Sequence, residues 1–307
     1  MAPEFAAGAR WNYSNTGYVL LGILVRKASG RFYGDVLRER VFVPLGMKTA
    51  RIISEEDIVP NRAAGYRIVA GELKNQQWVA PQLNTTADGS LYLSVLDLAA
   101  WDRGLRAQAV LKPQSWVEVF QPVRLNSGRT YPYGFGWQIA EIAGQKVERH
   151  GGSWQGFKTY LARYLGDDLT VIVLANLAQA EPERFVDGIA AIVNPKLAPA
   201  EPTSIPDREP QITARLTQLL VVTGEGRLAP DEFAYVRAGF FPEVARRYTE
   251  LLQGLGAPQR VDLIDRRELG DDRIYDYQVV YAAERAFRVS LGLAPDDKIS
   301  SFSVRPR

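Results

Sequence analysis

Residues 11–18 read Trp11-Asn12-Tyr13-Ser14-Asn15-Thr16-Gly17-Tyr18 and lead directly into a long apolar segment. That segment, residues 16–29, predicts a buried helix that stops at Gly30, because glycine commonly follows the last turn of a helix. Asn15 is a suitable N-cap, since its side-chain oxygen can accept a hydrogen bond from the first turn. The stretch therefore predicts a Tyr-x-Asn triplet fixed at the start of a core helix.

Downstream, the sequence predicts further helices and then strands. A helix is expected over residues 33–42, loops over 48–90, and a helix from Ser94 to Leu105 with Ser94 as N-cap and Asp97 in its first turn. A short helix follows Pro113. From Tyr133 the pattern becomes extended, predicting strands at residues 134–139, 146–150, 157–165 and 169–176, then a helix over 183–193. His150, followed by Gly151 and Gly152, ends the second of these strands.

A proline-rich segment separates this region from the rest of the chain. Residues 194–211 contain five prolines, a composition typical of an exposed, semi-extended linker. Beyond it, helices near residues 212–222, 230–237 and 242–254 precede strands at 259–269, 272–282, 286–292 and 299–304, a pattern that indicates a small α+β domain. The sequence thus predicts residues 1–195 as one domain, a linker at 196–211 and a separate domain at 212–307.

The composition argues against several classes of function. The chain has 307 residues, with 37 Lys and Arg against 35 Asp and Glu, a balance unlike that of a nucleic-acid-binding face. It has no cysteine, which excludes disulfides, and one histidine, whereas zinc sites usually take two or three. No apolar run approaches the ~20 residues of a membrane span, and residues 1–8 lack the regions of a signal peptide. We expect no cofactor, metal, nucleic acid or membrane span.

Five groups of residues, in this order, resemble the serine β-lactamase and penicillin-binding-protein superfamily, most closely its class C, D-alanyl-D-alanine carboxypeptidase and esterase-like branch. They are Tyr13-Ser14-Asn15-Thr16-Gly17-Tyr18, Pro44-Leu45-Gly46-Met47, Asp88-Gly89-Ser90 before the helix with Asp97 and Trp101, Tyr133-Gly134-Phe135-Gly136-Trp137, and His150-Gly151-Gly152 with Gly156-Phe157. The resemblance covers residues 8–177. It implies an α+β fold: a partial β-lactamase-like domain, with a helical region and an antiparallel sheet, before the small α+β domain.

The superfamily motif that carries the nucleophile and its base, Ser-x-x-Lys, does not occur in the chain. None of the eight lysines has a serine three positions before it; those positions hold Leu24, Leu45, Gly71, Ala109, Ala143, Gln155, Val193 and Pro295. The chain therefore resembles the latter part of the family's catalytic domain. The earlier part, with Ser-x-x-Lys and the first strands of the sheet, is expected to be missing.

The resemblance implies a role for each matching residue. In this family a serine attacks a carbonyl to form an acyl-enzyme, and Tyr13 would help move the proton. A phenol has an ordinary pKa of ~10, so Tyr13 would need neighbouring positive charge to act as a base near neutral pH. Asn15 would hydrogen-bond the substrate's amide and the lysine of Ser-x-x-Lys, and His150 would place a polar or cationic group at the mouth of the site. Gly151 and Gly152 would leave room for substrate, and the backbone N–H of Ser153 would form half of the oxyanion hole.

These residues also have structural interpretations. Tyr13 could be a buried tyrosine with a hydrogen-bonded hydroxyl, Asn15 an N-cap and nothing more, and His150 a surface residue. The stretch from Gly151 to Gln155 nearly spells a Gly-x-Ser-x-Gly nucleophile elbow. However, Gln155 replaces the last glycine and there is no second histidine, so we do not expect Ser153 to be a nucleophile. Three acidic pairs lie in expected turns, which argues against a metal site at Asp167-Asp168, Asp271-Asp272 or Asp296-Asp297.

The resemblance implies a β-lactamase-related serine hydrolase that cleaves an amide or ester through an acyl-serine: a β-lactam, a D-Ala-D-Ala peptide or a small ester. Without Ser-x-x-Lys, the chain is expected to be a truncated, inactive form. The alternative is a non-catalytic binding or regulatory protein derived from this fold, and the gene sequence upstream of Met1 would separate the two.

The expected partner is a small-molecule or peptide substrate. Missing strands would also leave an exposed sheet edge, at the strand of residues 146–150, and such edges favour self-association. The compartment stays open, although members of the family are often exported.

Overall fold

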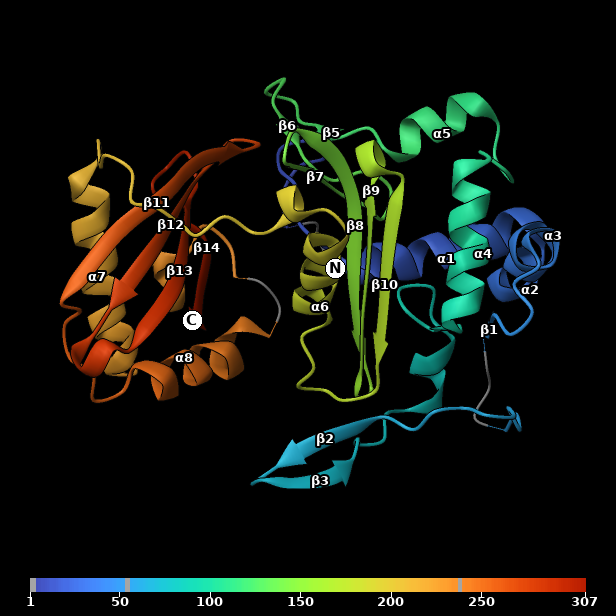
Figure 1. Ribbon diagram of the computed structural model, residues 1–307, viewed down its shortest axis with the longest axis horizontal. Coiled ribbons are helices and arrows are strands. Elements are labelled where there is room, and N and C mark those ends of the chain that lie inside the picture. The colour runs from blue at the N-terminus through green and yellow to red at the C-terminus, as the bar shows by residue number, and fades with distance from the viewer. Residues whose placement is uncertain (1–3, 53–55, 237–238) are drawn as a thin grey trace. The chain divides into compact units, whose positions relative to one another are not determined.

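The computed structural model describes residues 4–52, 56–236 and 239–307 and divides into two compact units (Figure 1). The larger unit comprises Asn12–Val123 and Pro132–Pro199, and the smaller unit comprises Met1–Trp11, Arg124–Tyr131 and Ala200–Arg307. The division into 1–195, 196–211 and 212–307 stays a prediction. Among the described residues, no helix has both the length and the apolar character needed to cross a membrane.

The larger unit begins with helices and short strands. Its helices are α1 (Asn15–Ser29), α2 (Tyr33–Leu37), α3 (Val43–Leu45), α4 (Val95–Arg106), α5 (Pro113–Val119) and α6 (Pro182–Val193), with a π-helical turn, Arg38–Phe42, between α2 and α3. The short strands are β1 (Arg51–Ile52), β2 (Tyr66–Val69), β3 (Glu72–Asn75) and β4 (Leu91–Tyr92). β1 pairs with β4 and β2 with β3, so residues 48–90, predicted as loops, include the β2–β3 pair and the strand β1.

One antiparallel sheet organises the rest of the larger unit. Its strands are β7 (Gln138–Ile142), β8 (Gln145–Trp154), β9 (Phe157–Tyr164) and β10 (Leu169–Ala175), in the order β10-β9-β8-β7. On one face, Val186 and Ala190 of α6 pack against Val147 and Tyr160. On the other face, the core contains Leu105 of α4, Trp116 of α5, Trp137 and Leu161. His150 pairs with Leu161 in the β8–β9 register, so it shares the face covered by α4 and α5.

The sequence predicted an open edge along residues 146–150, whereas the structure pairs residues 147–149 on both sides. Residues 146–150 lie in β8, which pairs with β7 up to Arg149 and with β9 on its other side. In the part of the chain that the structure describes, the sheet's edge strands are β7 and β10. The prediction was wrong because Ala143 and Gly144 both have positive φ (51° and 75°), as a tight hairpin requires, and fold β7 back onto β8.

α1 differs from the predicted helix in its cap and in its burial. Ser14 is the N-cap, and its Oγ accepts the backbone N–H of Gly17 at 3.1 Å, whereas Asn15 is the first helical residue. The helix ends as predicted at Gly30, which has a left-handed φ of 71°. None of its 15 residues is buried. Five large apolar side chains are 37–58% exposed: Leu20, Leu21, Ile23, Leu24 and Val25. Its composition predicted burial, but burial also needs a packing partner, which the described residues do not supply on this side.

The start of α4 confirms the predicted cap. The backbone N–H of Asp97 donates to Ser94 Oγ at 3.2 Å, and the backbone N–H of Ser94 donates to the Asp97 carboxylate at 2.9 Å. The backbone N–H of Thr49 donates to the same carboxylate at 3.1 Å. Asp97 therefore joins the first turn of α4 to a distant segment.

A buried network of charges ties α4 to the sheet. Arg163 of β9 donates from Nε to Asp102 of α4 at 2.9 Å, and its other guanidinium nitrogen donates to Glu148 of β8. Thr170 of β10 donates its hydroxyl to Asp102 at 2.9 Å. The Arg163 and Glu148 side chains are 8% and 3% exposed. Because Glu148 is two residues before His150, the network fixes the strand that carries the histidine.

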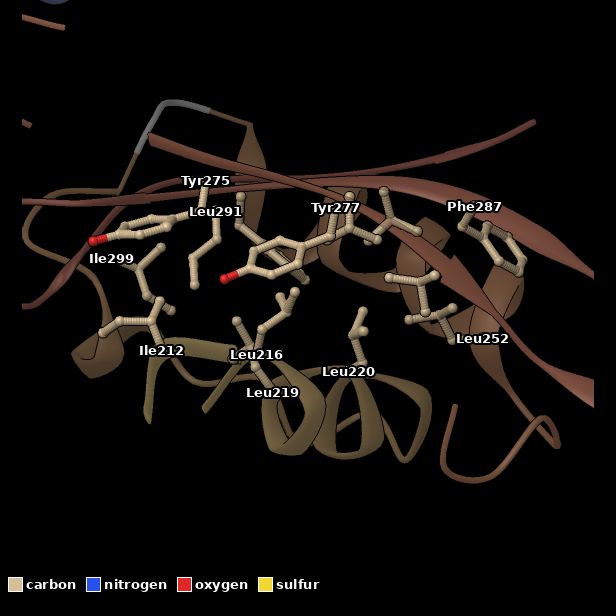
Figure 2. Close-up of a cluster of buried hydrophobic side chains, with 14 of the residues drawn as sticks. Ile212, Leu216, Leu219, Leu220, Leu252, Tyr275, Tyr277, Phe287, Leu291 and Ile299 are labelled. Atoms are coloured by element: carbon tan, nitrogen blue, oxygen red, sulfur yellow. The ribbon is translucent and has the colours of Figure 1, made fainter. Parts of the chain in front are cut away.

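The smaller unit has its own core. Its helices are α7 (Pro210–Gly224) and α8 (Ala245–Leu252), and its sheet is β11 (Arg260–Leu269), β12 (Asp272–Val280), β13 (Ala286–Leu293) and β14 (Ile299–Pro306), paired in that order. A hairpin, β5 (Val123–Arg124) and β6 (Thr130–Tyr131), carries residues 124–131 of this unit. Figure 2 shows Leu216 and Leu220 of α7 packed beneath Tyr277 and Leu291 of the sheet.

The predicted elements of the smaller unit are largely present. The four strands lie within two residues of their predicted bounds. The helix expected over 230–237 is a 3-10 turn at Pro230–Glu232, and its last residue, 237, lies outside the described residues. Both units combine helices with antiparallel sheets, which confirms the predicted α+β class.

Candidate active site

The motif residues Tyr13 and His150 lie together in the larger unit. Tyr13 lies two residues before α1 and His150 lies in β8, and their ring centroids are 6.0 Å apart. Tyr133, from the segment before β7, completes the cluster. Its ring meets Tyr13 edge-on at 6.3 Å, and its hydroxyl oxygen is 2.8 Å from Nε2 of His150. The cluster thus joins three segments that are distant in the sequence.

The hydrogen bonds of His150 define where its proton lies. Nδ1 is 2.7 Å from the carbonyl oxygen of Gly151, and a carbonyl can only accept, so Nδ1 carries a hydrogen. In the neutral imidazole Nε2 is then the acceptor, and the hydroxyl of Tyr133 donates to it. Burial lowers the pKa of His150, with the Gly151 carbonyl opposing part of the shift, so the neutral form is favoured near neutral pH. The resemblance implied either a polar or a cationic group at this position, and the structure favours a neutral, polar imidazole.

Tyr133 of the cluster and Tyr18, near the start of α1, are held in the protonated state. Burial is the main reason that the pKa of Tyr133 lies well above its ordinary value, and the neighbouring Tyr18 and Tyr13 add to the rise. Burial and Tyr13 likewise raise the pKa of Tyr18, in the first turn of α1. Among the described residues, no hydrogen bond joins Tyr13 to a lysine or arginine. These contacts therefore do not supply the positive charge that a tyrosine base would need.

β8 continues past the cluster as a strand with one free side. β7 pairs with β8 only as far as Arg149, while β9 pairs with it as far as Trp154. In the described part of the chain, residues 150–154 therefore have no ladder partner on the side away from β9. Backbone groups on such an edge can hydrogen-bond an extended substrate as an added strand.

Gly151 and Gly152 lack side chains for different reasons. A Cβ at Gly151 would lie 2.9 Å from Cδ2 of Tyr160, a ring in the core beneath α6, so packing requires glycine there. A Cβ at Gly152 would lie 2.6 Å from Oγ1 of Thr159, the end of a side chain that can rotate. Packing thus accounts for Gly151, and the role of leaving room for substrate stays a prediction for Gly152.

Two loop segments fix the free end of β8. Gln155 and Gly156 form the turn to β9 and both have positive φ, 46° and 83°, as a two-residue hairpin requires. The indole N–H of Trp154 donates to the side-chain oxygen of the buried Asn84 at 2.9 Å. Gly65 approaches so closely that a Cβ there would lie 1.9 Å from the carbonyl oxygen of Gln155. The end of β8 and the turn that follows it are therefore supported by residues outside the sheet.

The role predicted for Asn15, a hydrogen bond to the substrate's amide, stays a prediction. Asn15 is exposed in the first turn of α1, and no hydrogen bond among the described residues joins it to His150. Strand alternation directs the side chain of Ser153 to the face opposite His150, as expected for a residue that is not a nucleophile. The oxyanion role of its backbone N–H stays a prediction.

Tyr133 is the residue that the sequence analysis did not assign to the site. The signal was present, because Tyr133 opens the Tyr-Gly-Phe-Gly-Trp group that matched the superfamily pattern. The histidine bond joins residues 17 apart, and no local pattern indicated it. Among the described residues, no group of three or more His, Cys, Asp or Glu side chains could hold a metal ion.

Comparison with known proteins adds the family. Residues 1–193 match the family model described as Beta-lactamase. The chain belongs to the Beta-lactamase family. This confirms the predicted membership of the serine β-lactamase and penicillin-binding-protein superfamily. The matched part of this Beta-lactamase-family chain includes Tyr13, Tyr133 and His150.

Curated relatives and a solved structure agree with this. The chain is 32% identical over 184 residues to "Penicillin-binding protein 4*" of Bacillus subtilis (strain 168), covering 56% of this chain and 41% of that protein. It is 25% identical over 224 residues to a D-aminopeptidase of Gluconobacter oxydans (strain 621H), covering 69% and 42%. The chain therefore spans about two-fifths of the length of these relatives. The crystal structure of a penicillin-binding protein from Bacillus halodurans superimposes with a TM-score of 0.55 at 24% identity, over 62% of this chain and 59% of that one, and shares the fold.

Proposed function

We propose that this chain carries the tyrosine and histidine side of a β-lactamase-type serine hydrolase site for amides of D-amino acids. The observation that carries the proposal is the Tyr13–Tyr133–His150 cluster beside the free stretch of β8. The similarity to a D-aminopeptidase favours D-amino-acid amides over small esters, and the similarity to a penicillin-binding protein keeps β-lactams among the candidate ligands.

The cluster suits the proton transfers of an acyl-serine mechanism. In such a mechanism the serine oxygen attacks the carbonyl carbon, the carbon–nitrogen bond breaks with a proton passing to the leaving amine, and water then cleaves the ester. We assign the proton relay to the hydroxyl of Tyr13. The neutral His150 and Tyr133 hold the Tyr13 ring by aromatic contact. The free side of β8 would bind the substrate backbone, and the N–H of Ser153 would stabilise the oxyanion.

These 307 residues are expected to bind such ligands without turning them over, because they contain no Ser-x-x-Lys. The chain is predicted not to hydrolyse nitrocefin, p-nitrophenyl acetate or D-phenylalanine amide above background. Ser153→Ala is predicted to give the same background rate. Measurable turnover that Ser153→Ala abolishes, in a variant of unchanged stability, would contradict both the inactivity and the position of Ser153 outside the chemistry.

Ligand binding is tested separately, and the single histidine makes that test selective. D-phenylalanine amide is expected to shift the imidazole NMR signals of His150 in a saturable way, and L-phenylalanine amide to shift them less. Tyr13→Phe keeps the ring and removes the hydroxyl, so it serves as the matched variant. Signals that respond equally to both enantiomers, or to neither, would contradict the proposal.

The second candidate is a non-catalytic binding or regulatory protein, which the absence of Ser-x-x-Lys favours. Both candidates predict binding, so binding alone does not separate them. An in-frame Ser-x-x-Lys in the gene sequence upstream of the Met1 codon would favour the hydrolase. An independent start signal for translation at Met1 would favour the binding protein.

We also propose that this chain associates with itself. β10 is an edge strand, and the apolar side chains of α1 are in contact with water, both of which promote association. Sedimentation velocity is expected to show concentration-dependent dimers or larger species. Replacing Leu20 and Leu24 by glutamine is expected to reduce them, and a monomer at every concentration would contradict this part of the proposal.

A further inference from the structure

The smaller unit contains two segments that directly precede the active-site tyrosines in the sequence. Residues up to Trp11 and residues 124–131 group with Ala200–Arg307, whereas Tyr13 and Tyr133 belong to the larger unit. Trp11 is two residues before Tyr13, and Tyr131 is two residues before Tyr133. Within the smaller unit the rings of Trp11 and Tyr131 stack, with centroids 4.0 Å apart and planes inclined by 12°.

The turn between β11 and β12 holds the hairpin that carries Tyr131. The backbone N–H of Gly270 in this turn donates to the carbonyl oxygen of Thr130 at 3.1 Å. Arg129 forms an ion pair with Glu268 at 2.5 Å. Gly270 has a positive φ of 60°, and a Cβ there would lie 2.8 Å from Cδ1 of Leu125. The turn and the hairpin are therefore in contact with no room for a side chain between them.

The segment that carries Trp11 is held in the same unit. The backbone N–H of Asn126 donates to the carbonyl oxygen of Gly8 at 2.8 Å, and its side-chain amide donates to that of Ala7 at 2.9 Å. The guanidinium of Arg10 lies 4.6 Å from the ring centroid of Tyr235, within cation–π range. Both partners of the stack are thus anchored to residues of the C-terminal part.

The tethers from the stack to the site are each one residue long. Asn12 links Trp11 to Tyr13, and Pro132 links Tyr131 to Tyr133. Two residues span at most ~7 Å, and the proline ring fixes its own φ and restricts the residue before it. The stack therefore restrains the spacing of Tyr13 and Tyr133, whose rings meet edge-on at 6.3 Å.

We propose that Trp11 and Tyr131 are positioning residues for the site, and that the β11–β12 turn of the C-terminal part holds them in place. The proposal rests on the proposed function, because only that function makes Tyr13 and Tyr133 part of an active site. The stack and the spacing of the two tyrosines can nevertheless be tested in the chain without ligand. A stack that only contributes to stability would leave the site unchanged in a variant that still folds. The two interpretations therefore differ in what happens at His150.

The imidazole NMR signals of His150 in the ligand-free chain provide the readout. Trp11→Ala is expected to shift them by more than a line width, and Trp11→Phe, which keeps a ring, is expected to restore them. Gly270→Ala is expected to shift them from the C-terminal side. Gly254→Ala is the matched control, because Gly254 also has a positive φ, 75°, and a Cβ there would meet nothing within 4 Å.

Circular dichroism and the melting temperature identify any variant that loses its fold. Unchanged His150 signals in a folded Trp11→Ala variant would overturn the proposal. Equal shifts in the two glycine variants would overturn it as well, and that comparison decides alone if Trp11→Ala does not fold. Failure of D-phenylalanine amide to bind would contradict the proposed function and leave this result unaffected.

Discussion

Replacing Arg163 by methionine tests the buried charge network that anchors β8. The substitution removes a guanidinium that donates to Asp102 and to Glu148, and it leaves both carboxylates in place. A hydrogen bond to a charged group contributes ~1.5–3 kcal/mol, so two of them amount to about 3–6 kcal/mol. Asp102 keeps Arg106 at 2.7 Å, and Glu148 keeps Lys146 at 3.0 Å. Because each carboxylate keeps one cationic partner, we expect a loss at the lower end of this range, about 3 kcal/mol in the free energy of unfolding.

Urea denaturation followed by tryptophan fluorescence measures this loss, because three tryptophans of the larger unit pack in the core next to the network: Trp101, Trp116 and Trp137. Arg184→Met is the matched control. It removes an arginine from an ion pair whose partners are 82% and 64% exposed, and such pairs contribute ~0–1 kcal/mol. A loss below ~1 kcal/mol for Arg163→Met, or equal losses for the two variants, would refute the reasoning.

The same variant has a defined pH dependence. Although burial opposes it, hydrogen bonds from Arg106, Thr170 and Arg163 hold the pKa of Asp102 below its ordinary value. A depressed carboxylate pKa stabilises the folded state above the unfolded pKa of ~3.9, and that stability is lost as pH falls through the folded pKa. Arg163→Met raises the folded pKa toward the unfolded one. The contribution of Asp102 is therefore predicted to be smaller at neutral pH and to disappear at a higher pH than in the parent chain.

Three further predictions follow from local geometry. Asp97→Ala removes the capping box and the contact with Thr49, and it is expected to lower the free energy of unfolding in urea by about 1–2 kcal/mol. A variant as stable as the parent chain would show that the capping box does not stabilise α4. Gly65→Ala is expected to lower the melting temperature because a Cβ there would meet the carbonyl oxygen of Gln155, while Gly89→Ala, whose Cβ would meet nothing within 4 Å, is expected to leave it unchanged. A fragment of residues 200–307 contains the whole apolar cluster between α7, α8 and the sheet of β11–β14, and it is expected to give a dispersed amide NMR spectrum. A collapsed spectrum would show that this cluster needs the rest of the chain.

The sequence predicted local contacts well. Ser94 as the N-cap of α4 and the glycine that ends α1 were both predicted, because each depends on residues within one helical turn. The cap of α1 shows the limit of this reasoning. Ser14 and Asn15 can both cap a helix, and which of them does so depends on the backbone angles at the first turn, which composition does not encode.

Contacts between distant segments were the ones missed. The apolar residues of α1 predicted burial, but burial depends on a packing partner elsewhere and not on the helix itself. The Tyr133–His150 bond and the pairing of β7 with β8 likewise depend on how a hairpin folds back. The family resemblance brought Tyr13 and His150 to one site before any geometry was known, whereas the alternation of apolar residues alone would not have done so.

The exposed apolar face of α1 also affects how stability changes with temperature. The heat capacity of unfolding rises with the apolar surface that moves from the folded interior into water. Leu20, Leu21 and Leu24 are more than half exposed before unfolding begins, so α1 adds less to this heat capacity than a buried helix of the same sequence. The chain is therefore expected to fall below the usual ~12–15 cal/mol/K per residue, and its free energy of unfolding to follow a flatter curve between cold and heat.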